Sequence, residues 1–95
     1  MEFDWNNVPF EIESPLSQKG IEESFEDPFA VKLLPDTPRF AVQARFFNLG
    51  AAASGVGIFS VYRTNGKLTR VLFARPFTAE EKFFYQKKMN QILAA

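Results

Sequence analysis

The chain has 95 residues, of which 46% are hydrophobic and 16% aromatic, so we expect one compact core and no extensive disorder. It contains no Cys and no His, which excludes a disulfide framework and the common zinc sites, and we expect neither a metal nor a cofactor. Its formal net charge is zero, and nothing in it resembles a secretion signal or a membrane span, so we expect a cytoplasmic location and no membrane partner.

The neutral total conceals two oppositely charged parts. Residues 1–30 hold eight acidic residues and one basic residue, whereas residues 31–95 hold ten basic and three acidic residues, so the net charges are −7 and +7. A basic body favours a polyanion such as RNA, and an acidic segment can cover that body or bind a second protein. An ordinary solvated surface explains the same pattern, and both readings stay open.

The chain is predicted to be a single α+β domain. Pro9 and Pro15 argue against a long N-terminal helix, and Ser14-Pro15 fits the N-cap and first residue of a short helix that Gly20 ends. The predicted parts are an acidic helical or irregular segment at 1–28, an antiparallel sheet at 29–75 and a C-terminal helix at 78–93.

Four apolar segments alternate with turn signals and predict a four-stranded antiparallel meander. Asn65-Gly66 is typical of a type I′ turn, which requires positive φ at both central residues. The predicted strands are 29–34, 40–49, 57–63 and 67–75, joined by a turn at 35–38, a small-residue connection at 50–55 and the Asn65-Gly66 turn.

A capping box predicts where the last helix begins. The hydroxyl of Thr78 can accept from the Glu81 amide, while the Glu81 carboxylate reaches back to the Thr78 amide. The helix is predicted to pack on the sheet through a stripe at helical spacing. That stripe consists of Tyr85, Met89, Ile92 and Leu93.

Two arginines lie in the last predicted strand. Arg70 and Arg75 are an odd number of positions apart, so a regular strand places them on opposite faces. Arg75 is expected to pair with Glu81 as a structural contact between the strand end and the helix start. Tyr85 lies on the packing stripe of the helix and is expected to be a core residue.

Cations spread over a sheet face can contact successive phosphates of a bound strand. The residues that fit this role are Arg45, Arg63, Lys67 and Arg70. RNA cleavage needs no metal when the 2′-hydroxyl is the nucleophile, so a base and a cation for the developing charge are sufficient. The candidate bases are Tyr62, Glu81 and Tyr85, and the candidate cations are Arg45, Arg70 and Arg75; spacing alone does not select among them.

Several short motifs occur in the order found in a known bacterial family. They are Phe3-Asp4-Trp5, Lys19-Gly20-Ile21, Phe25-Glu26-Asp27-Pro28, Arg45 with Gly50, Val61-Tyr62, Arg70, Ala74-Arg75, Thr78, Glu81 and Tyr85. In this order the chain resembles the BrnT toxins of type II toxin–antitoxin systems, and the likeness from Arg45 to Tyr85 needs no gap.

The resemblance implies a RelE-like α+β fold, metal-independent endoribonuclease activity and neutralisation by a BrnA-like antitoxin protein. It implies an active face composed of Arg45, Tyr62, Arg70, Arg75, Glu81 and Tyr85. The family's Lys-His-Gly motif is replaced by Gln18-Lys19-Gly20, so the histidine is missing. The alternative expectation is therefore a non-catalytic protein-interaction module on the same scaffold, in the form of a homodimer.

Overall fold

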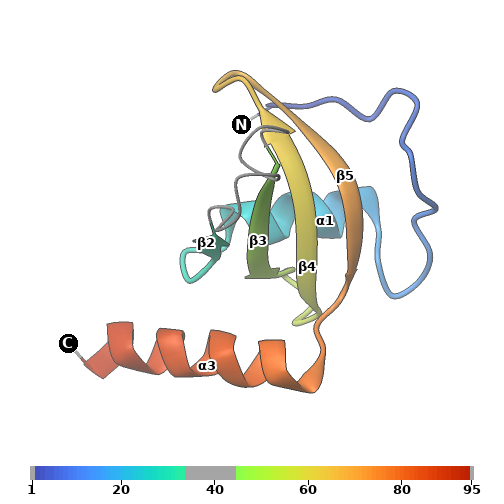
Figure 1. Cartoon of the computed structure of the whole chain (residues 1–95). Helices are drawn as coiled ribbons and strands as arrows, with labels where there is room; N and C mark the ends of the chain where they lie inside the picture. Colours follow the sequence, from blue (N-terminus) through green and yellow to red (C-terminus); the bar gives the residue numbers. More distant parts are fainter. Residues whose placement is uncertain (1, 34–44, 95) are drawn as a thin grey trace.

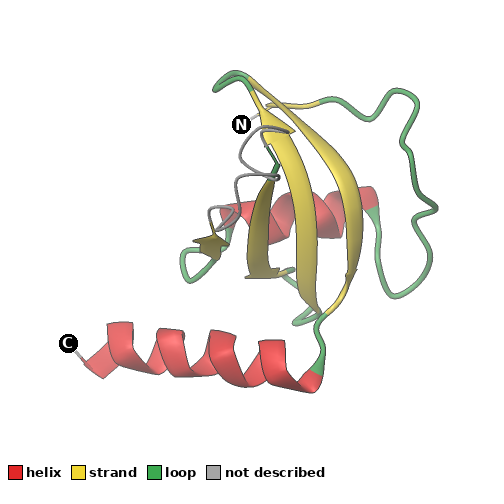
Figure 2. Cartoon of the chain, viewed as in Figure 1, coloured by secondary structure: helices red, strands yellow, loops and turns green. Residues whose placement is uncertain are grey.

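The computed structural model describes residues 2–33 and 45–94. It consists of a curved sheet with one helix on its face and one helix across its end (Figure 1). Figure 2 shows α1 behind the sheet, whereas α3 runs past the ends of the strands and extends beyond them. The strands are β1 (Glu2–Phe3), β2 (Val31–Leu33), β3 (Phe46–Ala51), β4 (Gly57–Thr64) and β5 (Leu68–Pro76), and the helices are α1 (Gln18–Glu26) and α3 (Ala79–Ala94).

Within the described ranges, the sheet has five strands in the order β1-β5-β4-β3-β2. The four strands β2 to β5 form the predicted antiparallel meander. The fifth strand was not predicted: β1 lies parallel to β5, with Glu2 opposite Leu68 and Phe3 opposite Thr69. The sheet is therefore mixed, and the prediction of a purely antiparallel four-stranded sheet is wrong in this detail.

The predicted strand boundaries need adjustment at the start of β2 and at both ends of β3. β2 begins only at Val31, because the Asp27 carbonyl and carboxylate accept from Ala30 and Phe29 and hold a turn before it. β3 begins at Phe46 and continues through Gly50 to Ala51. The predicted turn at 35–38 and the first half of the predicted strand at 40–49 lie outside the described residues.

The first helix begins later than predicted. Ser17, not Ser14, is the N-cap, and its hydroxyl accepts from the Gly20 amide at 2.9 Å. Gly20 lies inside α1 and does not end it. An added Cβ at Gly20 would be 3.6 Å from the Cβ of Ala52, so the small residue allows α1 to approach the loop after β3.

Gly50 was expected in a flexible connection but is a buried residue of β3. A Cβ at this position would lie 1.9 Å from the carbonyl oxygen of Ser24 in α1. The helix backbone therefore crosses directly over the strand at Gly50, and this close approach explains the glycine.

The hairpin between β4 and β5 is confirmed, but its predicted turn type is wrong. Three residues, 65–67, separate the strands, and Gly66 has a φ of +91° while Asn65 does not have a positive φ. The Asn65 carboxamide oxygen instead accepts from the amides of Lys67 and Leu68. This side chain closes the turn in place of a type I′ backbone pair.

A bulge in the β4–β5 ladder overturns the prediction that Arg70 and Arg75 face opposite sides. Tyr62 pairs with Val71 and Val61 pairs with Phe73, so Leu72 is an extra residue on β5. One extra residue inverts the alternation of side chains beyond it. Arg70 pairs with Arg63 and Arg75 pairs with Phe59, which puts both arginines on the face opposite α1.

The core lies between α1 and the sheet. Ile21 and Phe25 of α1 are buried against Ile58, Tyr62 and Val71 of the sheet. Phe25 contacts Tyr62 edge-on at 4.9 Å between ring centroids, and Phe3 contacts Phe25 at 5.3 Å. Phe3, Trp5, Phe10, Ile12 and Leu16 pack against this core, so the N-terminal segment is attached by its apolar side chains.

The capping box of α3 is confirmed, but its predicted packing stripe is confirmed only in part. Tyr85 is buried and Met89 is partly buried, whereas Ile92 and Leu93 are 57% and 65% exposed because α3 has passed the edge of the sheet by then (Figure 1). Neither α1 nor α3, the helices of the described residues, is long and apolar enough to cross a membrane.

Candidate functional site

The junction between β5 and α3 is held by a bidentate ion pair. Arg75 donates to both carboxylate oxygens of Glu81, at 2.7 and 2.9 Å, as expected from the sequence. Glu81 also accepts from the Thr78 amide at 2.8 Å, and Thr78 Oγ1 accepts from the Glu81 amide at 3.2 Å. Glu81 therefore serves both the ion pair and the capping box.

The electrostatics of this pair keep Glu81 ionised. The hydrogen bonds from Arg75 hold the pKa of the Glu81 carboxyl below its usual range, against the opposing effect of burial. The guanidinium of Arg75 also lies over the Phe59 ring, 4.4 Å from its centroid. Arg75 therefore holds the start of α3 through two hydrogen bonds to the Glu81 carboxylate, and its guanidinium also contacts the Phe59 ring.

Tyr85 is connected to the end of α1, and not to Arg75. Its hydroxyl donates to Oδ2 of Asp27, which also accepts from the Ala51 amide at 2.8 Å. Burial and the Asp27 carboxylate both raise the pKa of Tyr85, so the phenol stays protonated at neutral pH. A phenol that donates to a carboxylate is poorly suited to act as a general base.

Arg70 binds the segment that follows β1. Its guanidinium donates to the carbonyl oxygens of Asn6 and Asn7 at 2.7 and 2.6 Å, and it lies 3.5 Å from the Asp4 carboxylate. Asn7 has a φ of +52°, a conformation that asparagine tolerates better than most residues. Arg70 therefore shapes the N-terminal loop.

The remaining RNA-binding candidates are exposed. Arg63 lies directly across from Arg70 on β4, and Lys67 is in the hairpin turn. Arg45 precedes β3 and is also exposed. Arg63 makes no ion pair with any residue in 2–33 or 45–94, so its guanidinium is available to a ligand on this face.

Tyr62 lies on the other side of the sheet from these cations. It is buried against Phe25 and Phe46 on the face that α1 covers, and burial raises the pKa of its phenol. Arg70 and Arg75 are five residues apart along β5, roughly 15 Å at strand spacing. Of the candidate catalytic residues, Arg75 and Glu81 are thus in contact at the start of α3, whereas the others lie outside this contact: Arg45, Tyr62, Arg70 and Tyr85. The RNA-binding candidate Arg63 pairs with Arg70 across the β4–β5 ladder.

Sequence reasoning missed the role of Asp27, which connects α1, β3 and α3. Its carboxylate accepts from Phe29, Ala51 and Tyr85. Lys32 lies nearby, 3.3 Å from Oδ1 of the buried Asn48, and burial lowers its pKa despite the opposing charge of Asp27. The Asp27-Pro28 dipeptide signals a turn, but these partners are too distant in sequence to be inferred from it.

In the described part of the chain, no group of three or more acidic residues, of the kind that could hold a metal ion, comes together. A scan against protein-family models found no match for the chain, and searches of curated proteins and of solved structures also found none.

Proposed function

We propose that the chain is a non-catalytic protein-interaction module, and that two copies associate through the end of α3. The observation that carries this proposal is the exposure of Ile92 and Leu93, which continue the packing stripe of Tyr85 and Met89 beyond the sheet. Ile92 and Leu93 lie one helical turn beyond Met89 on the same side of α3, and we call these three residues the tip stripe. Apolar side chains gathered on one exposed helix face are typical of an interaction surface.

The candidate catalytic groups are already engaged in contacts within the protein, which supports binding over catalysis. Glu81 is held by Arg75 and Thr78, and Tyr85 donates to Asp27. Tyr62 is buried on the other face of the sheet. A reaction at one phosphate needs a base and a cation that are both free to reach the same atoms, but Arg75 and Glu81 are bonded to each other and Tyr62 lies on the opposite face of the sheet.

A second copy of the chain fits the tip stripe. If two α3 helices pair antiparallel about Gln91, Met89 of one copy lies opposite Leu93 of the other, and Lys88 lies opposite Ala94. This register places Met89 against Leu93 on both sides of the centre and avoids a lysine facing a lysine. Because few side chains are involved, the dimer is expected to be weak and concentration-dependent.

Sedimentation equilibrium over a wide concentration range tests this proposal. The wild type is expected to dimerise, and Ile92→Asp or Leu93→Asp is expected to weaken the association at least about tenfold, the equivalent of roughly 1.4 kcal/mol. Leu68→Asp is the matched control, because Leu68 is an exposed leucine at the hairpin, far from α3. A wild type that stays monomeric, or an equal effect of the control, would refute the dimer.

A second candidate is a BrnT-like ribonuclease toxin that binds RNA on a basic sheet face and is neutralised by a BrnA-like antitoxin. The β5 bulge favours it, because the bulge gathers Arg63, Arg70 and Arg75 on one face together with Phe59. Arginines beside aromatic rings can contact phosphates and stack on unpaired bases.

Fluorescence anisotropy with a labelled single-stranded RNA, together with an expression assay, tests the second candidate. It predicts binding that weakens with salt, a loss of binding in Arg63→Ala, and growth arrest with RNA cleavage on expression that Arg75→Ala abolishes. Lys19→Ala is the control, because Lys19 is an exposed cation on α1. If expression is harmless, RNA stays intact and no RNA binding is found, the ribonuclease candidate is refuted and the interaction module is the remaining candidate.

A further inference from the structure

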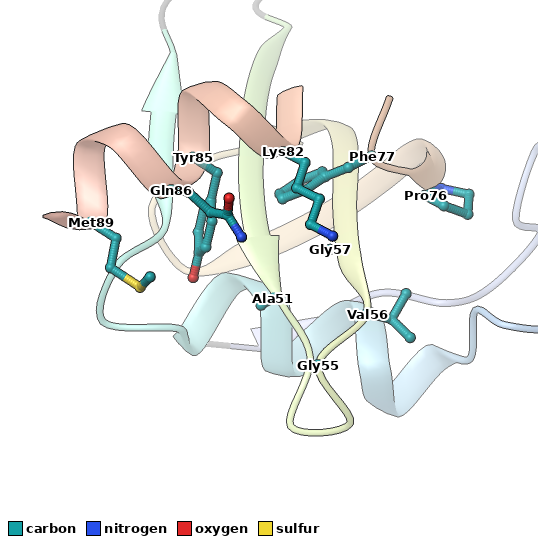
Figure 3. A pocket seen from close by; sticks show the side chains of 10 residues that line it. All are labelled: Ala51, Gly55, Val56, Gly57, Pro76, Phe77, Lys82, Tyr85, Gln86 and Met89. Carbon is teal, nitrogen blue, oxygen red and sulfur yellow. The ribbon is translucent and has the colours of Figure 1, made fainter. Parts of the chain in front are cut away.

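A cleft of about 270 Å³ separates α3 from the turn between β3 and β4 (Figure 3). Lys82, Tyr85, Gln86 and Met89 form its helix wall, since residues spaced by three or four share one helix face. The opposite wall consists of strand ends and the turn. Figure 3 shows Lys82 and Gln86 extending from α3 toward that wall.

The floor of the cleft is apolar and closely packed. The Phe77 ring lies against Gly57, where an added Cβ would be 2.2 Å from the ring, and its centroid is 5.4 Å from that of Tyr85. Val56 and Met89 complete the apolar lining. This part of the cleft suits a flat or short apolar group.

Two polar groups stand at the mouth of the cleft. The ammonium of Lys82 forms no ion pair with any residue of the described ranges, and the carboxamide of Gln86 lies one turn further along α3. Asp27, to which Tyr85 donates, is not among the lining residues, and Lys82 is the only charged residue among the described residues that line the cleft. The available charge at the mouth is therefore positive.

We propose that this cleft binds the carboxylate end of a small apolar molecule, with the carboxylate on Lys82 and Gln86 and the apolar body on Phe77. A lysine ammonium and an amide N–H both donate to a carboxylate, and an apolar floor with a few convergent polar groups is typical of a ligand site. Since a water molecule occupies about 30 Å³, the volume accommodates roughly eight to ten non-hydrogen atoms. Met89 lines this cleft and also belongs to the tip stripe, so the two proposals are tested separately with a variant outside the cleft.

Three ligands of equal size and different charge test the proposal: benzoate, benzamide and benzylamine. In a titration followed by amide NMR, benzoate is expected to shift the amides of Gly55, Gly57 and Gln86 and to saturate at millimolar concentration. Benzamide is expected to bind at least about fivefold more weakly, because it lacks the charge that Lys82 recognises.

Variants assign the preference to the cleft. Lys82→Met is expected to abolish the difference between benzoate and benzamide, whereas Lys87→Met, which removes an exposed lysine that does not line the cleft, is expected to preserve it. The Gln86→Met variant tests whether the Gln86 carboxamide also binds the carboxylate. If benzylamine binds as tightly as benzoate, or if benzoate gives no saturable shifts at the cleft in folded wild type, the proposal is wrong.

A carboxylate can come from a free metabolite-sized acid or from the C-terminus of a polypeptide. A capped dipeptide that ends in a phenylalanine carboxylate, compared with its C-terminal amide, separates these sources. A peptide acid that binds more tightly than benzoate identifies a chain terminus, and the reverse order identifies a small acid. The same titrations on Ile92→Asp separate this result from dimerisation, because Ile92 belongs to the tip stripe and does not line the cleft.

Discussion

The Tyr85 hydroxyl donates a hydrogen bond to the Asp27 carboxylate, and the two residues are 58 positions apart in the chain. Asp27 ends α1 and holds the turn into β2, while Tyr85 is the buried residue of α3. Together with the Arg75–Glu81 pair, this contact fixes the position of α3 across the strand ends.

Tyr85→Phe is therefore expected to lower the free energy of unfolding by about 1–2 kcal/mol, because Asp27 loses a donor at a partly buried site. Hydrogen exchange should accelerate in α3 more than in β4. Tyr62→Phe is the matched control, since the Tyr62 hydroxyl makes no hydrogen bond to residues 2–33 or 45–94, and it should cost less. Equal costs for both variants would contradict this role of Asp27.

The Arg75–Glu81 pair predicts a defined acid dependence of stability. Because the folded-state pKa of Glu81 is depressed, its contribution is complete above the unfolded-state pKa and is lost as the pH falls through the folded-state value. Arg75 is 36% exposed, so water screens the pair and the contribution is on the order of 0.5 kcal/mol. Urea unfolding from pH 6 downward, a range set by the ordinary carboxyl pKa of about 4.3, measures it.

Arg75→Met is expected to flatten this part of the pH profile. The variant keeps the apolar contact with Phe59 but leaves Glu81 with only the capping-box bonds. A wild-type profile that Arg75→Met leaves unchanged would show that other carboxyl groups cause the acid dependence.

Gly50→Ala is expected to be the most damaging glycine substitution. Its methyl group would meet the Ser24 carbonyl, and α1 must move or the strand must bend, at a cost of about 3 kcal/mol or more. Gly55→Ala is the control, because Gly55 has a φ of +96° with no atom within 4 Å and should cost only about 1 kcal/mol of backbone strain. Thermal unfolding measures both, and the reverse order would disprove the close approach of α1.

Ser60→Ala is expected to leave stability unchanged or to raise it by up to about 1 kcal/mol. The Ser60 hydroxyl is fully buried and has no hydrogen-bond partner among the described residues. Ser24→Ala provides the comparison, because the Ser24 hydroxyl donates to the Ile21 carbonyl at 2.6 Å and its removal should not stabilise. A marked destabilisation in Ser60→Ala would indicate that the hydroxyl does have a partner.

Features that depend on short sequence spacing were predictable from the sequence. The Thr78–Glu81 capping box, the β4–β5 hairpin and the alternation along β4 each involve neighbours within a few residues. The Arg75–Glu81 pair follows from the same junction, since the two residues flank the short connection from strand to helix and are only six positions apart.

Features that depend on distant contacts were not predictable. The sequence around Gly50 is typical of a loop, and only the position of α1 explains why a glycine is needed there. The two residues of β1 are too few to show the alternation that predicts a strand. The bulge at Leu72 leaves no signal in composition, yet it decides that Arg70 and Arg75 share a face. The contact between Arg75 and Glu81 could therefore be anticipated from the sequence, whereas the burial of Tyr62 on the opposite face of the sheet could not.

The bulge also affects how the sheet meets other molecules at its edge. β1 pairs with β5 only at Leu68 and Thr69, so the outer edge of β5 beyond them has no strand beside it among the described residues. An incoming strand needs a regular row of donors and acceptors, and Leu72 breaks that row while Pro76 has no amide hydrogen to offer. Growth of the sheet from copy to copy, the first step toward fibrils, is therefore disfavoured along this edge.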